Sequence, residues 1–412
     1  MNYPTLEDVV GNTPLVRLKR ITAGKNNTLL AKLEGNNPAG SVKDRPALSM
    51  LSEAEARGEI SPGDTLIEAT SGNTGIALAM AAALKGYNMT LIMPENASAE
   101  RKQAMAAYGA KLITASKEGG MEEARDIADA MIARGEGKPL NQFANPDNPL
   151  AHYRTTGPEI WRQTGGEVTH FVSSMGTTGT IMGVSRYLKE QNPSIQVVGA
   201  APAGSVYSGG TGRPYLVEGV GEDFWPTTYD RDICDEIVAV SDADSFAMTR
   251  RLAREEALLV GGSCGMAVVA ARQLAHELAE EGRTDAVIVV LLPDSGRGYL
   301  TKIFNDEWLA QYGFATSEGG DVSRTVGEVL RGKSGRLPDL VHTHPNETIA
   351  EAVAILQEYG VSQMPVVRAE PPIVAAEVAG SVSERALLDA LFAGHASLTD
   401  QVEDHMSAPL PT

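Results

Sequence analysis

The chain has 412 residues, enough for two or three domains, and its 42% hydrophobic content is typical of a globular protein with a large core. Its formal net charge of −18 argues against a nucleic-acid partner, which would need clustered lysine and arginine. The two cysteines imply no disulfide framework and favour a reducing, cytoplasmic setting. The sequence predicts no signal peptide, no membrane-spanning segment and no metal site, because apolar runs are short and the histidines are scattered.

Strand-like and helix-like runs alternate through most of the chain. The expected strands cover residues 29–34, 65–69, 89–94, 110–115, 169–174, 195–200 and 286–293. The expected helices cover residues 46–60, 74–86, 98–109, 180–192 and 244–258, with a long helix after Ser263. Ser98 is a good N-cap, and Gly86 and Gly109 are good helix ends. Such alternation indicates βαβ units around parallel sheets, whose ligands bind at the carboxyl ends of the strands.

The composition changes at residues 316–324, "TSEGGDVSR", which indicates a linker. We therefore expect a catalytic domain at 1–312, a linker at 313–324 and a smaller unit at 325–412. In the smaller unit the expected order is strand 340–344, helix 348–360, strands 363–368 and 378–383, and helix 384–394. This order of elements occurs once, so we expect one motif, with a second copy that is truncated or absent after residue 400.

Four loops between strands and helices carry groups suited to chemistry. In "GNNPAGSVKDR", residues 35–45, one lysine, Lys43, stands where a polar turn becomes a helix. The motif "TSGNTG" at 70–75 offers hydroxyls, an amide and backbone N–H groups at a helix start, which suits a carboxylate. The motif "GTTGT" at 176–180 suits a phosphate monoester, because it has neither a Walker lysine nor the dinucleotide glycine spacing. The motif "GGSCG" at 261–265 places a serine at another helix start.

Each of these loops also has an ordinary structural interpretation. Lys43 could be a solvated surface charge, Ser263 an N-cap, Cys264 a small buried hydrophobe, and the glycines and hydroxyls parts of turns. Together, however, a lysine, a carboxylate site, a monophosphate site and a serine match a cofactor with one phosphate and one aldehyde. Pyridoxal 5′-phosphate has both groups.

Seven motifs are arranged as in one enzyme family: "GNTPLVRL", "GSVKDR", "TSGNTG", "QFANPDNP", "TTGPEIW", "GTTGT" and "GGSCG". In these motifs the chain resembles the pyridoxal-phosphate β-synthases, cysteine synthase and cystathionine β-synthase. The resemblance implies a tryptophan-synthase-β-like α/β fold (fold type II) with two parallel-sheet subdomains. It also implies β-replacement on serine or O-acetylserine through an aminoacrylate, and a homodimer.

The resemblance assigns roles to individual residues. Lys43 matches the lysine that binds the cofactor and then acts as a base. Asn73 matches the partner of the cofactor's 3′ oxygen, and Ser263 the partner of its pyridine nitrogen. The residues that match the phosphate cradle are Gly176, Thr177, Thr178, Gly179 and Thr180. The residues that match the substrate-binding site are Thr70, Ser71, Asn73, Thr74, Gln142 and Gly219.

The two halves of the chain resemble different members of the family. Up to about residue 200 the chain is similar to cysteine synthase B, and beyond it to bacterial cystathionine β-synthase, although Ala201 and Ala203 replace two carboxylates at the seam. Residues 217–226, "VEGVGEDFWP", match the second type, and Glu218 and Asp223 are candidates to bind the amino group of the acceptor, or else solvated loop acids. We therefore expect cystathionine β-synthase, which joins L-serine to L-homocysteine. The alternative is cysteine synthase, which joins O-acetylserine to sulfide.

The C-terminal unit resembles one CBS motif, a regulatory module. Two copies normally form the cleft for an adenosyl ligand, and here Ala386 stands at the aspartate of the nucleotide-contact pattern. Both features argue against an adenosyl ligand and favour a packing or dimerisation unit. Two further classes remain open: a serine/threonine dehydratase, which adds no thiol, and a non-catalytic adenosyl sensor.

Overall fold

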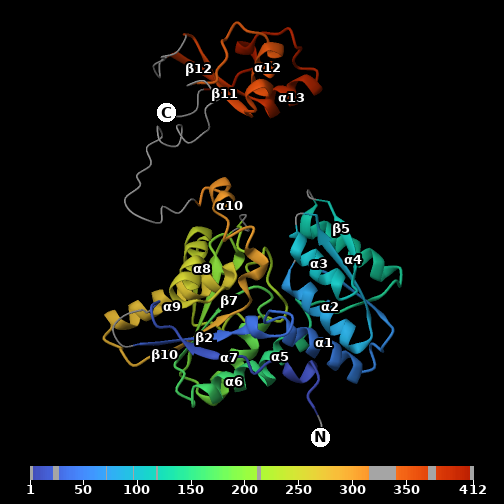
Figure 1. Cartoon of the computed structure of the whole chain (residues 1–412), viewed down its shortest axis with the longest axis vertical. Coiled ribbons are helices and arrows are strands. Elements are labelled where there is room, and N and C mark those ends of the chain that lie inside the picture. Colours follow the sequence, from blue (N-terminus) through green and yellow to red (C-terminus); the bar gives the residue numbers. More distant parts are fainter. Residues whose placement is uncertain are drawn as a thin grey trace. The chain divides into compact units, whose positions relative to one another are not determined.

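The structure, a computed structural model, describes residues 3–21, 27–70, 72–95, 97–116, 119–210, 215–314, 340–369 and 377–408. The chain divides into two units, Met1–Thr316 and Ser317–Thr412 (Figure 1). In the described residues, no helix is long and apolar enough to span a membrane.

The larger sheet of the first unit has the order β1-β2-β10-β7-β8-β9. Its strands are β1 Leu15–Arg17, β2 Thr28–Leu33, β10 Val287–Leu292, β7 His170–Ser174, β8 Gln196–Pro202 and β9 Glu236–Val240. All neighbours are parallel except β1 and β2. Ile288 and Val290 belong to the core formed with α8 (Asp242–Glu256) and α9 (Gly262–Glu280), whereas Val289 and Leu291 belong to the opposite core. Burial on both faces explains the unbroken apolar run of β10.

The other face of this sheet is covered by α6 (Thr156–Gln163) and α7 (Gly179–Gln191), and α5 (Asp147–Arg154) packs against α7 (Figure 1). Residues of α6 and α7 share the core of Val289 and Leu291. A short helix, α10 (Asp306–Gln311), follows the last strand.

The smaller sheet has the order β5-β4-β3-β6 and is parallel throughout. Its strands are β3 Thr65–Ala69, β4 Asn88–Pro94, β5 Lys111–Ala115 and β6 Lys138–Pro139. Side chains of α1 (Asp44–Ala56) and α2 (Asn73–Lys85) form the core on one face, and those of α4 (Gly120–Ala133) the core on the other. The expected parallel-sheet α/β fold with two subdomains is confirmed (Figure 1).

The helix ends of this subdomain follow the sequence signals. Ser98 caps α3 (Ala99–Ala107), because its hydroxyl accepts a hydrogen bond of 3.4 Å from the N–H of Arg101. Gly86 ends α2 with φ of 78°, a left-handed conformation that costs glycine little. The interpretation of Ser263 as an N-cap is wrong, because Gly261 occupies that position of α9.

The second unit contains α12 (Ile349–Tyr359), β11 (Gln363–Val367), β12 (Val378–Ser383) and α13 (Glu384–Phe392). The expected strand at 340–344 is wrong, because only Thr343 forms an isolated bridge, to Val366. In the described tail, Val402 is buried in the core of this unit, and Ser407 pairs with Ser381. Most of the expected linker, from residue 315 on, lies outside the described residues.

Candidate active site

One cavity of about 410 Å³ lies between the two subdomains of the first unit, where the carboxyl ends of their strands meet loops. The predicted residues that line it are Lys43, Thr70, Asn73, Thr74, Gln142, Gly176, Thr177, Gly219 and Ser263. A small adjoining cavity is also lined by Lys43 and adds Thr178 and Thr180. Gly179 begins α7 and packs against Asn148, and Ser71 lies outside the described residues. Residues spread over 220 positions of sequence therefore face one space.

Lys43 immediately precedes α1 and projects into this cavity, so it is not a solvated surface charge. Burial lowers the pKa of its amine, while the negative charges of Asp294 and Glu222 act in the opposite direction. Its amine forms no hydrogen bond with the described residues. A lysine amine with a lowered pKa is a better nucleophile towards an aldehyde.

A buried ionic cluster anchors the segment that carries Lys43. Arg45 donates to Glu34 (Nε to Oε2, 2.7 Å) and to Glu159 (Nη1 to Oε1, 2.7 Å). Lys32, which is fully buried, donates to the second oxygen of Glu159 at 2.7 Å. Burial alone would raise the pKa of Glu159, but Arg45 and Lys32 hold that pKa at about 2. The cluster ties the start of α1 to β2 and α6, a role of "GSVKDR" that the sequence did not reveal.

The TSGNTG loop is joined to its neighbours by side chains. The hydroxyl of Thr74 donates to Oε1 of Gln142 at 2.8 Å. Asn148 donates through one amide nitrogen to the carbonyl of Gln142 at 2.8 Å and to the hydroxyl of Thr177 at 3.1 Å. Asn148 thus connects the TSGNTG loop with the GTTGT loop. Asn148 belongs to the motif "QFANPDNP", which carries no local signal for this connecting role.

The GTTGT loop forms a close-fitting turn at the start of α7. A Cβ atom on Gly176 would lie 2.7 Å from the carbonyl oxygen of Gly219, so the two backbones approach closely. Thr178 has φ of 65°, which turns the chain sharply before the helix. The hydroxyl of Thr180 lies 3.3 Å from Nε2 of His152, whose pKa burial lowers well below 6.5. Free N–H groups at a helix start beside threonine hydroxyls form a cradle that fits a phosphate.

Ser263 lines the cavity, and Asp294 lies behind its wall, bonded to two lining residues. The hydroxyl of Ser263 faces the cavity and forms no hydrogen bond with the described residues. Asp294, absent from our predictions, accepts hydrogen bonds from the amide of Asn73 at 2.7 Å and the hydroxyl of Tyr299 at 2.6 Å. Cys264 is fully buried beside Asp294, and burial raises its thiol pKa, as expected of a packing residue.

These groups fit pyridoxal 5′-phosphate. The amine of Lys43 suits its aldehyde, the GTTGT loop its phosphate, and the hydroxyl of Ser263 its ring nitrogen. When bound, the cofactor withdraws electrons from the α-carbon of an amino acid. Among the described residues, no group of three or more histidine, cysteine, aspartate and glutamate side chains could hold a metal ion.

The acids of residues 217–226 do not lie as we expected. Glu218 pairs with Arg101 of α3 and accepts a hydrogen bond from Lys302 at 2.5 Å, so both its oxygens are occupied. Asp223 is exposed and does not line the cavity. Glu222 lines it instead: burial raises the pKa of Glu222 to about 7, while the charges of Arg125 and Lys43 oppose this rise. Of the two acids that we singled out, Glu218 lines the cavity with both oxygens engaged and Asp223 does not line it, whereas the carboxyl of Glu222, which we did not single out, lines it without a hydrogen bond from the described residues.

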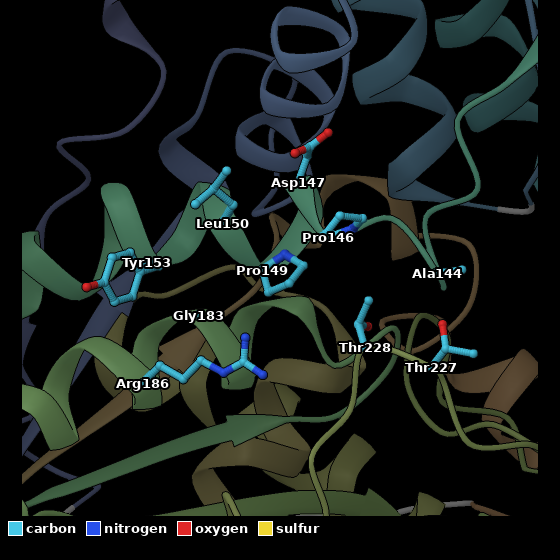
Figure 2. A pocket seen from close by; sticks show the side chains of 10 residues that line it. All are labelled: Ala144, Pro146, Asp147, Pro149, Leu150, Tyr153, Gly183, Arg186, Thr227 and Thr228. Carbon is cyan, nitrogen blue, oxygen red and sulfur yellow. The ribbon is translucent and has the colours of Figure 1, made fainter. Parts of the chain in front are cut away.

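A separate hollow of about 670 Å³ lies between α5, α7 and the loop of Thr227 and Thr228 (Figure 2). Its walls include Pro149 and Arg186 but none of the predicted site residues. The cavity around Lys43 is therefore the candidate active site.

Known proteins match both the fold and the site. The family of pyridoxal-phosphate dependent enzymes matches residues 6–294, and the CBS domain family matches residues 336–393. Cysteine synthase B of Pseudomonas aeruginosa is 60% identical over 302 residues, which are 73% of this chain and 97% of that protein. Cystathionine beta-synthase of Rattus norvegicus is 40% identical over 415 residues, which are 97% of this chain and 72% of that protein. The crystal structure of O-acetyl serine sulfhydrylase isoform 3 from Entamoeba histolytica is 37% identical, with a TM-score of 0.70, and the match covers 73% of this chain and 91% of that one.

Fold and cavity thus define an enzyme of fold type II that uses pyridoxal 5′-phosphate. Within that class, the chain belongs to the family of β-replacement enzymes that contains the cysteine synthases and cystathionine β-synthases. This family takes amino-acid substrates, and the alternative of a non-catalytic sensor is excluded. The C-terminal unit contains the expected CBS domain.

Proposed function

We propose that this enzyme joins L-serine to L-homocysteine and forms cystathionine. The observation that carries the proposal is Glu222, a carboxylate on the cavity wall whose oxygens accept no hydrogen bond from the described residues. An acceptor with an ammonium group, such as homocysteine, would use this carboxylate, whereas sulfide has no group for it. The similarity to rat cystathionine beta-synthase over 97% of this chain supports the same assignment.

The described residues supply the steps of such a reaction. The helix-start N–H groups and hydroxyls of the TSGNTG loop hold the donor's carboxylate. Lys43 Nζ removes the α-proton of the donor and afterwards gives a proton to the departing hydroxyl of serine. The GTTGT loop holds the cofactor's phosphate. Ser263 would hold the ring nitrogen through a neutral hydroxyl rather than a carboxylate, a partner that would favour elimination over transamination.

A product assay tests the proposal. The holoenzyme is offered serine or O-acetylserine, each with homocysteine or with sulfide, and the products are identified by mass spectrometry. We expect cystathionine to form fastest from serine and homocysteine. If a thiol product forms with sulfide but not with homocysteine, the proposal is overturned. Pyruvate as the main product would indicate a dehydratase.

Cysteine synthesis from O-acetylserine and sulfide is the second candidate. The observation that favours it is the 60% identity to cysteine synthase B of Pseudomonas aeruginosa, which spans 97% of that protein. Acetate leaves without the proton that hydroxide needs, so this reaction depends less on Lys43 as an acid. The same four-way assay separates the candidates.

A further inference from the structure

Arg125 lines the active-site cavity and has no acidic hydrogen-bond partner among the described residues. It lies on α4 in the smaller subdomain, and its Nε atom is buried without a hydrogen-bond partner in the described part of the chain. Its guanidinium carbon stands 5.4 Å from the centre of the Phe224 ring. Phe224 in turn packs edge-on against Phe143, with 5.2 Å between ring centres. An aromatic face thus holds the guanidinium in place and leaves its N–H groups available.

The other cations of this cavity wall are already engaged. Among the described lining residues, the lysines and arginines are Lys43, Arg101 and Arg125. Arg101 pairs with Glu218, and Lys43 is the amine proposed to carry the cofactor. Arg125 therefore remains the cation that an anionic group entering the described cavity would meet.

Arg125 and Glu222 both line the cavity and offer it groups of opposite charge type, a guanidinium and a carboxyl. Arg125 comes from α4, and Glu222 from the loop that follows β8 in the larger subdomain. The charge of Arg125 acts on the carboxyl of Glu222, although no hydrogen bond joins the two side chains. A free amino acid presents the same two charges, an ammonium and a carboxylate, on one carbon atom. A guanidinium from Arg125 and a carboxyl from Glu222, with no hydrogen bond between them, could therefore bind the two ends of a zwitterion.

We propose that Arg125 binds the carboxylate of the incoming amino-acid thiol while Glu222 binds its ammonium group. The inference rests on the proposed function, since it concerns the acceptor of that reaction. The donor's carboxylate has its own site at the TSGNTG loop, so Arg125 serves the second substrate. A planar guanidinium offers two parallel N–H groups to a carboxylate, which gives direction as well as charge. Arg125 then distinguishes amino-acid thiols from sulfide.

The test compares acceptors that differ in one charged group. The thiols are homocysteine, 4-mercaptobutyrate, which lacks the amine, 3-mercaptopropylamine, which lacks the carboxylate, and sulfide, which lacks both. The variants are Arg125→Gln, Arg125→Lys as the conservative replacement, and Arg134→Gln as a control at the exposed end of the same helix. KM and kcat are measured for each thiol on the holoenzyme. The change in cofactor absorbance on adding serine alone reports the first half-reaction.

We expect Arg125→Gln to raise KM for homocysteine and 4-mercaptobutyrate by about tenfold or more, the scale on which a lost charged hydrogen bond acts. The KM values for 3-mercaptopropylamine and sulfide, and the absorbance change with serine, should stay as in the wild type. Arg125→Lys should recover part of the loss, and Arg134→Gln should change nothing.

Three results would overturn the inference. Equal increases for homocysteine and sulfide would mean that Arg125 only supports the fold of the wall. If the wild type makes cystathionine and Arg125→Gln has the same KM for homocysteine, Arg125 is not part of the acceptor site. The proposed function would then remain intact. A wild type that uses sulfide and not homocysteine would overturn the proposed function itself, and the inference with it.

Discussion

Replacing Arg45 by methionine should destabilise the first unit strongly. Arg45 compensates two buried carboxylates, Glu34 and Glu159, and the arginine side chain is only 2% exposed. Methionine keeps much of the length and apolar contact but removes the charge and every N–H donor. Breaking a buried ion pair by removing one partner costs about 3–5 kcal/mol, because the other charge stays buried without compensation. Because Lys32 still donates to Glu159, the expected loss in the free energy of unfolding lies within that range rather than above it.

Fluorescence-monitored denaturation by urea measures this loss. Trp161, Trp225 and Trp308 are the only tryptophans of the chain and all belong to the first unit, so the signal reports that unit alone. The matched control is Arg134→Met, because Arg134 pairs with Glu136 at the surface, where the side chains are 59% and 42% exposed. The control should lose less than about 1 kcal/mol. Equal midpoints for the two variants would refute the role assigned to the buried cluster.

The cluster also predicts how this difference depends on pH. Arg45 and Lys32 hold the folded-state pKa of Glu159 at about 2, below its ordinary value of 4.5. The stabilisation from Glu159 is therefore complete above pH 4.5 and is lost as the pH falls towards 2. The gap in stability between wild type and Arg45→Met should be constant near neutral pH and narrow below pH 4.5. A gap that widens there would contradict this assignment.

Three further predictions concern other parts of the molecule. Gly176→Ala should weaken cofactor binding by about 1–3 kcal/mol, because its Cβ would crowd the carbonyl of Gly219. The control Gly298→Ala, whose Cβ would meet open space, should bind the cofactor as the wild type does. Absorbance titration with the cofactor measures both variants. Glu222→Gln should raise KM for homocysteine and not for sulfide, and equal KM changes for the two thiols would contradict the role of Glu222. Thr348→Ala should lower the stability of the second unit by about 1 kcal/mol through loss of the capping box at α12, seen by circular dichroism, with tryptophan fluorescence unchanged.

The elements that the sequence predicted well are those with strong local signals. The unbroken apolar run of β10 and the glycine end of α2 at Gly86 are found as expected. The expected strand at 340–344 failed because only one of its residues, Thr343, finds a bridging partner among the described residues. Strand formation depends on such a partner, which a short apolar run does not specify.

The candidate site was likewise predicted where residue types give a local signal and missed where distant residues decide. Lys43 and the TSGNTG and GTTGT loops are marked by residue types that few other roles require together. Sequence alone did not identify which acid of "VEGVGEDFWP" lines the cavity with unengaged oxygens, because the oxygens of Glu218 are engaged by Arg101 and Lys302, which are distant in sequence. Arg125 was missed for a similar reason, since one arginine on an amphipathic helix resembles any solvated charge until Phe224 and the cavity are placed around it.

Covalent capture of the cofactor tests the central claim most directly. The holoenzyme is reduced with borohydride, digested and analysed by mass spectrometry to locate the lysine that carries the pyridoxyl phosphate group. We predict the label on Lys43, and on no lysine in the Lys43→Ala variant. A label on another lysine of the wild type, or full labelling of Lys43→Ala, would contradict the assignment of this cavity as the active site.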